Sequence, residues 1–337
     1  MTETWVVTGG AGYIGGHVVA ALRREGIGVV VLDDLSTGRA ERLPADVPLV
    51  QGQVGDPGVL RSVLAGASGV VHLAALTSAP ESVVDPLAYY RANVTDTASL
   101  LSAMADAGVR RIVASSSAAV YGSAVGGALA EQDPPRPQNP YGTTKWIGER
   151  LLAEVGAATG TASVCLRFFN VVGAANARLA DTRTSALLPR VLRAAQGAPL
   201  TVHGLTHPTP DGSPVRDFVH VLDVADAHVA AVRRLSSGSS GSAVYNVGTG
   251  AGCSVLELIG VVEQLTGRPV RWSPGPVRAG DPSRSVADPA LIARELGWRA
   301  RWGVADAVSS AWAVRTPLVP TGPARFTRSF LQPAAAG

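Results

Sequence analysis

Three polar residues from two segments could together move a proton on and off a substrate oxygen. Tyr141 and Lys145 lie four residues apart in Tyr-Gly-Thr-Thr-Lys, so in a helix both side chains share one face. A tyrosine phenol has an ordinary pKa of about 10, and it acts as a base near neutral pH only where a cation stabilises the phenolate. Ser117 ends a run of three serines, and its hydroxyl could hold the substrate oxygen. Taken alone, the Tyr–Lys spacing also fits a surface pair on any helix.

The elements that must position these residues alternate in the first half of the chain. Short apolar runs rich in β-branched residues are followed by longer helical patterns, which indicates a parallel sheet covered on both faces. The fold class predicted is α/β, a Rossmann-type doubly wound parallel sheet with a smaller C-terminal mixed α/β domain. The expected strands are 4–8, 29–32, 48–54, 69–73, 111–115 and 162–168, and the expected helices are 13–25, 57–64, 86–107 and 141–158.

A glycine-rich turn joins the first expected strand to the first expected helix. The run TGGAGYIG, starting at Thr8, satisfies G-x-G-x-x-G, and Asp33 ends the next strand about 20 residues further on. Glycines in such a turn let backbone N–H groups approach a pyrophosphate, and the carboxylate accepts hydrogen bonds from the adenosine ribose hydroxyls. Asp33 could also be a simple turn residue. Because a carboxylate there repels a 2′-phosphate, the turn predicts NAD rather than NADP.

The alternation of strands and helices ends near residue 170. Segments rich in glycine and proline, such as 203–214 and 272–282, then alternate with helical stretches. The chain is therefore predicted to contain an NAD-binding domain over 1–170, to which some later segments return, and a substrate domain over 171–315. The final segment, 316–337, is rich in proline and alanine without a period and is predicted to be a tail.

Composition excludes several classes of protein. The chain is 46% hydrophobic and 16% charged, so it is not a disordered chain, and its net charge of +3 comes with no basic face that would bind nucleic acid. No apolar run approaches the roughly 20 residues that span a bilayer. Cys165 and Cys253 stand alone and the histidines are dispersed, so no metal site is expected. We expect a cytoplasmic protein.

Several longer motifs resemble the extended short-chain dehydrogenase/reductases, and within them the UDP-glucose (UDP-galactose) 4-epimerase family. The resemblance runs from about Trp5 to Trp312. It is carried by TGGAGYIG, VLDDLSTG, HLAAL, ESVVDPLAYYRANV, SSSAAVYG, PYGTTK, LRFFNVVGA, HPTPDGSPVRDFVHVLDVADAH and YNVGTG. It implies NAD as the cofactor, a nucleotide sugar such as a UDP-sugar as the substrate, and a homodimer formed through the helices expected at 86–107 and 141–158.

The resemblance also implies a role for each matching residue. Tyr141 would be the base, Lys145 would hold the nicotinamide ribose and tune Tyr141, and Ser117 would bind the sugar 4-oxygen. The substrate would contact Ser117, Tyr141, Asn170, Leu187, Arg216, Arg278 and Asp281. Arg216 could instead be only an ion-pair partner of Asp217. The cofactor would contact Gly9, Gly12, Tyr13, Ile14, Gly15, Asp33, Gln53, Val54, Leu73, Ala74, Ala75, Asn93, Ser115, Tyr141, Lys145 and Phe168.

The residues after Ser117 favour one reaction over its relatives. Related dehydratases and decarboxylases carry a carboxylate in this place, where this chain has Ala118 and Ala119. The predicted reaction is therefore interconversion of the C4 epimers of a UDP-hexose through a 4-keto intermediate. An epimerase or ketoreductase acting on a deoxy or unsaturated nucleotide sugar is the alternative enzyme. The alternative outside catalysis is an NAD-sensing binding protein.

Several positions depart from the family pattern and leave the sugar open. Thr77 replaces a lysine, Gln53 an aspartate near the adenine, and Ala186 an asparagine at the phosphates. Ser285 stands where some members have a bulky tyrosine, which would leave room for an N-acetyl group on the sugar. The sequence therefore predicts the reaction, and it leaves open which sugar the substrate carries.

Overall fold

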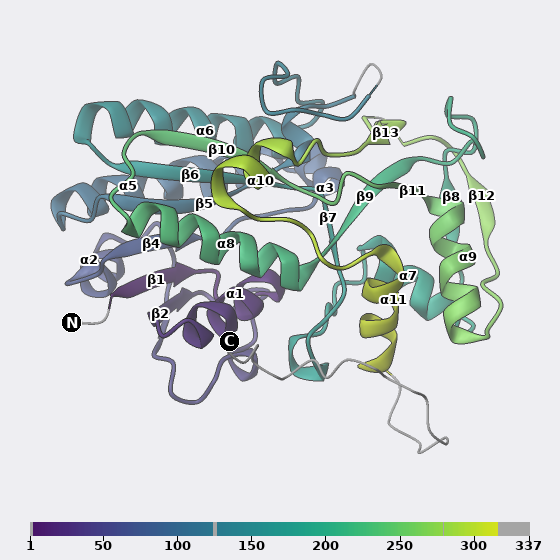
Figure 1. The fold of residues 1–337 in the computed structure, drawn as a ribbon, viewed down its shortest axis with the longest axis horizontal. Coiled ribbons are helices and arrows are strands. Elements are labelled where there is room, and N and C mark those ends of the chain that lie inside the picture. The colour runs from purple at the N-terminus through teal and green to yellow at the C-terminus, as the bar shows by residue number, and fades with distance from the viewer. Residues whose placement is uncertain (1–2, 124–126, 279, 316–337) are drawn as a thin grey trace.

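Seven parallel strands form the central sheet of the computed structural model, which describes residues 3–123, 127–278 and 280–315 (Figure 1). Their order is β10-β6-β5-β4-β1-β2-β3, so the direction of progress reverses between β1 and β4. In such sheets ligands bind at the carboxyl ends of the strands, beside that reversal. The strands are β1 (Thr4–Thr8), β2 (Gly28–Asp33), β3 (Leu49–Gln51), β4 (Gly69–His72), β5 (Arg111–Ser117), β6 (Ala162–Phe168) and β10 (Ser242–Val247).

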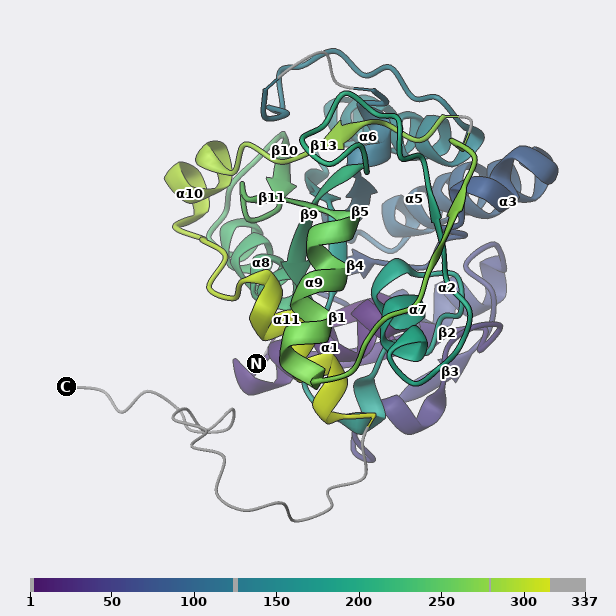
Figure 2. The ribbon, with the colours of Figure 1, turned by 90° about the vertical axis from the view of Figure 1, so that its right-hand side faces the viewer.

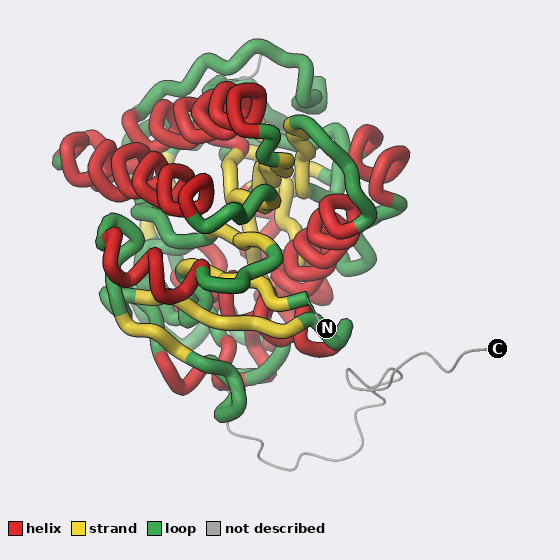
Figure 3. Tube along the Cα trace, turned by 90° about the vertical axis from the view of Figure 1, so that its left-hand side faces the viewer, coloured by secondary structure: helices red, strands yellow, loops and turns green. Residues whose placement is uncertain are grey.

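Helices cover both faces of this sheet because successive strand residues point to opposite sides. In β1, Trp5 and Val7 enter one buried cluster and Val6 enters another. One face carries α1 (Tyr13–Arg24), α8 (Val221–Ser236) and α10 (Ala290–Leu296), and the other carries α2 (Pro57–Leu64), α5 (Asp96–Asp106) and α6 (Pro140–Thr159). Figure 3 shows the strands lying between these groups of helices. The doubly wound Rossmann-type fold predicted from the sequence is confirmed.

Helix α6, which carries the Tyr–Lys pair, has well-defined start and stop signals. The Asn139 side chain accepts a hydrogen bond from the Gly142 N–H at 2.9 Å, and Pro140 occupies the first helical position. Gly160 ends the helix with a φ of 73°, a left-handed conformation that glycine adopts without steric cost. The start of α6 is thus fixed close to Tyr141.

The helix predicted over 86–107 is interrupted in the structure. It consists of α4 (Pro86–Tyr90), a π-helical turn over Arg91–Thr95 and α5, and α3 (Ala79–Val84) precedes it. Asn93 lies within the π-helical turn, and its side chain accepts from the Leu76 N–H at 2.9 Å and donates to the Leu76 carbonyl at 3.0 Å. Both bonds tie the turn to the segment after β4, which a periodicity argument does not reveal.

The second half of the chain builds a smaller mixed unit beside the sheet (Figure 2). Its main strands, grouped around β9, are β7 (Asn170–Val172), β9 (Val215–His220), β11 (Gly252–Ser254) and β13 (Arg284–Ser285), while β8 (Thr201–His203) pairs with β12 (Ser273–Gly275). Its helices are α7 (Leu187–Ala194), α9 (Val255–Thr266) and α11 (Val304–Ala313). Leu192, Phe218 and Leu258 lie in its own buried cluster. Short 3-10 turns occupy Ala40–Arg42, Ala118–Val120 and Ala177–Leu179.

Besides α10, two later elements return to the first half of the molecule. Strand β10 pairs with β6 at the edge of the central sheet, and α8 packs beside α1. The division into domains 1–170 and 171–315 stays a proposal, and the tail predicted over 316–337 lies outside the described residues. Within the described part of the chain, no helix is long and apolar enough to cross a membrane.

Candidate active site

The turn between β1 and α1 leaves backbone N–H groups at the start of a helix without a side-chain cap. Gly12 is the N-cap residue of α1 and supplies no capping side chain. Gly9 has a φ of 69°, and a Cβ atom there would lie 2.7 Å from the Ala74 nitrogen. Only glycine therefore fits this close approach. The exposed N–H groups and the positive end of the helix fit the pyrophosphate of a dinucleotide.

Asp33 ends β2 beside this turn, with its side chain buried. Its carboxylate accepts hydrogen bonds from the Ala11 and Leu35 N–H groups, each at 2.9 Å. Burial raises the pKa of Asp33, and these two hydrogen bonds oppose that shift. A carboxylate has about four acceptor sites, so two backbone bonds leave lone pairs for ribose hydroxyls. The position fits the predicted contact with the cofactor.

The other residues predicted to bind the cofactor gather at the same edge of the sheet. Tyr13, Ile14 and Gly15 begin α1, and the Tyr13 hydroxyl donates to the Gly173 carbonyl at 2.6 Å. Phe168 ends β6 in register with Ser117. The remaining ones follow β3, follow β4 or lie in the π-helical turn: Gln53, Val54, Leu73, Ala74, Ala75 and Asn93. Residues from six strand ends and the first helix therefore surround one site.

Tyr141 and Ser117 meet where α6 packs against the end of β5. Gly142 permits this contact, because a Cβ atom there would lie 2.5 Å from the Ala119 carbonyl oxygen. Burial raises the pKa of Tyr141, while a hydrogen bond with Ser117 and the positive charge of Arg183 lower it. The Tyr89 ring stands edge-on to the Tyr141 ring, with the ring centres 6.5 Å apart. The Tyr141 phenol therefore lies beside Ser117, and both side chains are predicted to contact the same substrate oxygen.

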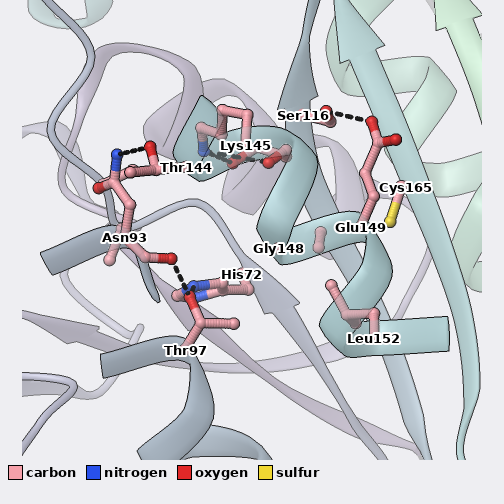
Figure 4. A pocket seen from close by; sticks show the side chains of 14 residues that line it. His72, Asn93, Thr97, Ser116, Thr144, Lys145, Gly148, Glu149, Leu152 and Cys165 are labelled. Atoms are coloured by element: carbon pink, nitrogen blue, oxygen red, sulfur yellow. Dashed lines mark hydrogen bonds between the residues drawn. The ribbon is translucent and has the colours of Figure 1, made fainter. Parts of the chain in front are cut away.

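Lys145 is buried one helical turn after Tyr141 (Figure 4). Its ammonium donates to the Ser115 carbonyl at 3.0 Å and to the Ser115 hydroxyl at 3.2 Å. Burial lowers the pKa of Lys145 to about 8, although the charge of Glu149 acts in the opposite direction. The Lys145 ammonium is therefore anchored to β5.

A buried ion pair that the sequence analysis missed holds α6 against the sheet. Glu149 binds Arg167 of β6 through two hydrogen bonds of 2.6 and 2.8 Å, and it also accepts from the Ser116 hydroxyl. The Arg167 guanidinium donates to the Tyr121 hydroxyl at 2.7 Å. An arginine within an otherwise apolar strand, together with a glutamate one turn beyond Lys145, was the available signal. This network fixes the face of α6 that carries Tyr141 and Lys145.

A small cavity lies behind Lys145, between α6 and the strands β4 and β5 (Figure 4). His72 lines it and bridges the hydroxyls of Thr8 and Thr97, at 2.7 and 3.1 Å. Burial lowers the pKa of His72 to about 3, so the imidazole is neutral at physiological pH. Asn93 donates to the Thr144 hydroxyl at 3.0 Å from the same cavity. These hydrogen bonds join β1, β4, α5 and α6 around the cavity that Lys145 also lines.

Apart from Ser117 and Tyr141, the residues predicted to bind the substrate lie on the smaller unit. Asn170 begins β7 and Leu187 begins α7. Arg216 of β9 forms an ion pair with Asp281, and not with its neighbour Asp217, whose carboxylate accepts from the Thr249 and Gly250 N–H groups.

The Arg278–Asp281 turn lies close to the loop that leads into α6. The Asp281 N–H donates to the Arg278 carbonyl at 3.2 Å. A Cβ atom on Gly280 would lie 3.5 Å from the Gln138 carbonyl. Ser285 of β13 is in register with Arg216 and is buried. The turn that follows Arg278 therefore lies near the segment before α6, and Ser285 pairs with Arg216 across adjacent strands.

Comparison with known proteins connects this geometry to one family. The sequence model described as the NAD dependent epimerase/dehydratase family matches residues 5–248. The chain belongs to this family. It is 43% identical over 300 residues to UDP-glucose 4-epimerase from Azospirillum brasilense. The aligned region covers 87% of this chain and 86% of that protein.

Solved structures of other proteins resemble this fold over most of the chain. A crystal structure of UDP-glucose-4-epimerase from Stenotrophomonas maltophila with bound NAD and formylated UDP-arabinopyranose has a TM-score of 0.88 and 39% identity, covering 93% of this chain and 98% of that one. MoeE5 in complex with UDP-glucuronic acid and NAD has a TM-score of 0.81 and 36% identity, covering 93% and 99%. The resemblance inferred from the motifs is confirmed, and the relatives' ligands share a uridine diphosphate while differing in the sugar.

Proposed function

We propose that this member of the NAD dependent epimerase/dehydratase family interconverts the C4 epimers of a UDP-hexose. One observation carries the proposal: Ser117 and Tyr141 meet at the carboxyl end of the sheet beside the dinucleotide turn, with Ala118 and Ala119 next to them. Removal of water or carbon dioxide would call for a carboxylate in that place. Epimerisation moves only the proton of the 4-hydroxyl and the hydride of C4. For these steps the serine, the tyrosine and the cofactor are sufficient.

The side chains of this chain divide the work at the sugar 4-oxygen. Ser117 holds that oxygen, and Tyr141 takes its proton as a phenolate and later returns it. Lys145 binds near the nicotinamide ribose, and its positive charge favours the phenolate. The glycine-rich turn and Asp33 would hold NAD, which would supply the acceptor and donor of the C4 hydride. Remote binding of the nucleotide keeps the keto sugar in the site while the sugar turns over.

Two observations support uridine diphosphate as the part of the substrate that the protein binds. They are the arginines of the smaller unit and the ligands of the relatives. The planar guanidinium of Arg216 and that of Arg278 match phosphate oxygens. The choice of hexose is wider, because the small Ser285 beside Arg216 leaves space for a larger substituent on the sugar. We therefore propose UDP-glucose and UDP-galactose as substrates, with N-acetylated or modified sugars also accepted.

The test is incubation of the purified protein, loaded with NAD, with UDP-glucose, UDP-N-acetylglucosamine and UDP-glucuronic acid in separate reactions. NMR of the sugar ring protons reports the configuration at C4. We expect interconversion of at least one sugar with no added reduced cofactor and no net change in NADH absorbance. Stoichiometric consumption of added NADH would instead identify a ketoreductase. A protein that binds NAD but converts none of these sugars would contradict the proposal.

We also propose that the protein is a cytoplasmic homodimer. Helices α3 and α4 expose a group of apolar side chains next to α6: Val83, Val84 and Leu87 are 64%, 86% and 63% exposed. Such a patch on a water-facing surface is typical of an interface between proteins, and a second copy of this chain fits the pairing expected for these helices. Sedimentation of the wild type against Val84→Glu would test it, since a dimer formed elsewhere would be unaffected.

A further inference from the structure

A segment of the smaller unit lies along the first turns of α1. It consists of residues 173–183, which we call the docking segment, and it follows β7. The Tyr13 hydroxyl donates to the Gly173 carbonyl at 2.6 Å, and the Ala175 N–H donates to Nε2 of His17 at 3.1 Å. Burial lowers the pKa of His17 to about 4, so its ring is a neutral acceptor at physiological pH. Two hydrogen bonds thus join the helix after the dinucleotide turn to the smaller unit.

Two further contacts bring the docking segment close to the same helix. A Cβ atom on Gly16 would lie 2.7 Å from Cδ2 of Leu179, so this close packing requires a glycine. The guanidinium carbon of Arg183 lies 5.2 Å from the centre of the Tyr13 ring, within the range of a cation–π contact. Asp181 orients Arg183 through hydrogen bonds of 2.8 and 2.9 Å. The docking segment therefore ends against the residue that begins α1.

Arg42 is a buried cation that contacts both the dinucleotide turn and the docking segment. It is 4% exposed and forms no ion pair with any residue that the structure describes. Its guanidinium donates to the Ala11 carbonyl of the turn at 3.3 Å. It also donates to the Ala180 carbonyl at 3.2 Å and to the Thr182 hydroxyl at 3.4 Å. A single side chain therefore joins the turn that is predicted to bind NAD to the smaller unit.

The burial of Arg42 is costly for a side chain that only fills space. A guanidinium taken out of water without a carboxylate partner loses hydration that carbonyl and hydroxyl acceptors replace only in part. Burial accordingly lowers the pKa of Arg42. An apolar side chain of similar size would fill the same volume without this cost. A positive charge fixed beside the dinucleotide turn, however, attracts the anionic pyrophosphate expected there.

We propose that Arg42 is a positioning residue that retains NAD by holding the docking segment against the dinucleotide turn. While the segment is docked, the backbone N–H groups of the turn stay in place for the pyrophosphate. When it separates from α1, the turn loosens and NAD dissociates. The inference rests on the NAD binding included in the function proposed above. It gives the smaller unit a second task, since the unit that binds the substrate also keeps the cofactor in place through turnover.

The experiment loads the purified enzyme with radiolabelled NAD and follows the bound label during a chase with excess unlabelled NAD. Arg42→Gln is expected to raise the rate constant of NAD dissociation about tenfold, the effect of losing one hydrogen bond from a charged donor. Arg42→Lys keeps the charge but reaches fewer acceptors, so its rate constant should lie between those of wild type and Arg42→Gln. Arg23→Gln is the matched control, because it removes the same charge from the other end of α1, where Arg23 is 41% exposed.

Variants of the docking segment separate the proposed retention from a local effect of Arg42 on the turn. Leu179→Ala weakens the packing against Gly16 without altering a residue predicted to bind the cofactor, and it should raise the dissociation rate several-fold. Thr182→Val removes one acceptor of Arg42 at an exposed position and should raise the rate about twofold. At saturating NAD, kcat and KM of Arg42→Gln for the UDP-sugar should stay within about twofold of wild type.

Three results would overturn the proposal. The first is an unchanged dissociation rate in Arg42→Gln. The second is a raised rate in Arg42→Gln with wild-type rates in both Leu179→Ala and Thr182→Val, which would confine the effect of Arg42 to the turn. The third is a tenfold fall in kcat at saturating NAD, which would mark a general structural defect. Epimerisation by the wild type decides the proposed function separately, because NAD exchange requires no sugar.

Discussion

The cofactor side and the substrate side of the cleft are built to different degrees of completion. On the cofactor side, Asp33 accepts two backbone hydrogen bonds, and Gly9 of the glycine-rich turn packs closely against the backbone of Ala74. On the substrate side, Arg278 has no counter-ion among the residues that the structure describes. A rigid, satisfied site binds its ligand with little loss of entropy, whereas a site with uncompensated charge is completed by the ligand itself. This suits a cofactor that stays through turnover and a substrate that must leave.

The largest expected effect comes from the junction between the two sides. Tyr141→Phe removes the group that exchanges the proton, so we expect kcat to fall about 1,000-fold, within the usual contribution of general acid–base catalysis. NAD content and UDP affinity should stay near wild type, which calorimetry and absorbance would show. Tyr90→Phe, on the exposed part of α4, is the control and should keep full activity. Retained activity in Tyr141→Phe would mean that another group moves the proton.

A smaller effect is expected on the cofactor side alone. Asp33→Ala should weaken NAD binding roughly 100-fold, because charged hydrogen bonds to the ribose contribute about 1.5–3 kcal/mol each. Discrimination against NADP should shrink as well, since the negative charge that opposes a 2′-phosphate is gone. Asp34→Ala is the matched control, because the neighbouring carboxylate is exposed and bonds only to Ser36 among the described residues. If both variants bind NAD equally well, the contrast between the two sides of the cleft fails.

The smallest expected effect concerns the sugar and leaves the cofactor untouched. Ser285→Tyr should lower kcat/KM for an N-acetylated UDP-sugar about tenfold and change UDP-glucose turnover little, because a bulky ring would fill the space beside Arg216. Initial rates with the two sugars, measured side by side, give the ratio. Ser283→Tyr, two residues earlier, tests whether a tyrosine anywhere in this segment has the same effect. Equal loss with both sugars would show that Ser285 does not set sugar size.

The local sequence pattern was enough to predict the elements of the repeating strand–helix units. Alternating apolar strands and helices predicted β1, β6 and α2 with the bounds that the structure gives them. The glycines of the first turn and Asp33 could be assigned because their spacing is fixed by the β-α-β unit itself. The helix expected over 86–107 was predicted to be continuous. Its π-helical turn is accompanied by hydrogen bonds between Asn93 and Leu76, and Leu76 belongs to a different segment that the local pattern does not include.

What the sequence determined about this protein is the identity of its chemical groups: a phenol and an ammonium one turn apart, a serine after a strand, and alanines where a carboxylate would change the reaction. Tertiary structure decided how those groups are supported and charged. The Glu149–Arg167 and Arg216–Asp281 ion pairs join residues from different elements, and burial among several elements lowers the pKa of Lys145 to about 8. Periodicity and spacing act over one element, whereas desolvation and charge depend on every element packed around a site.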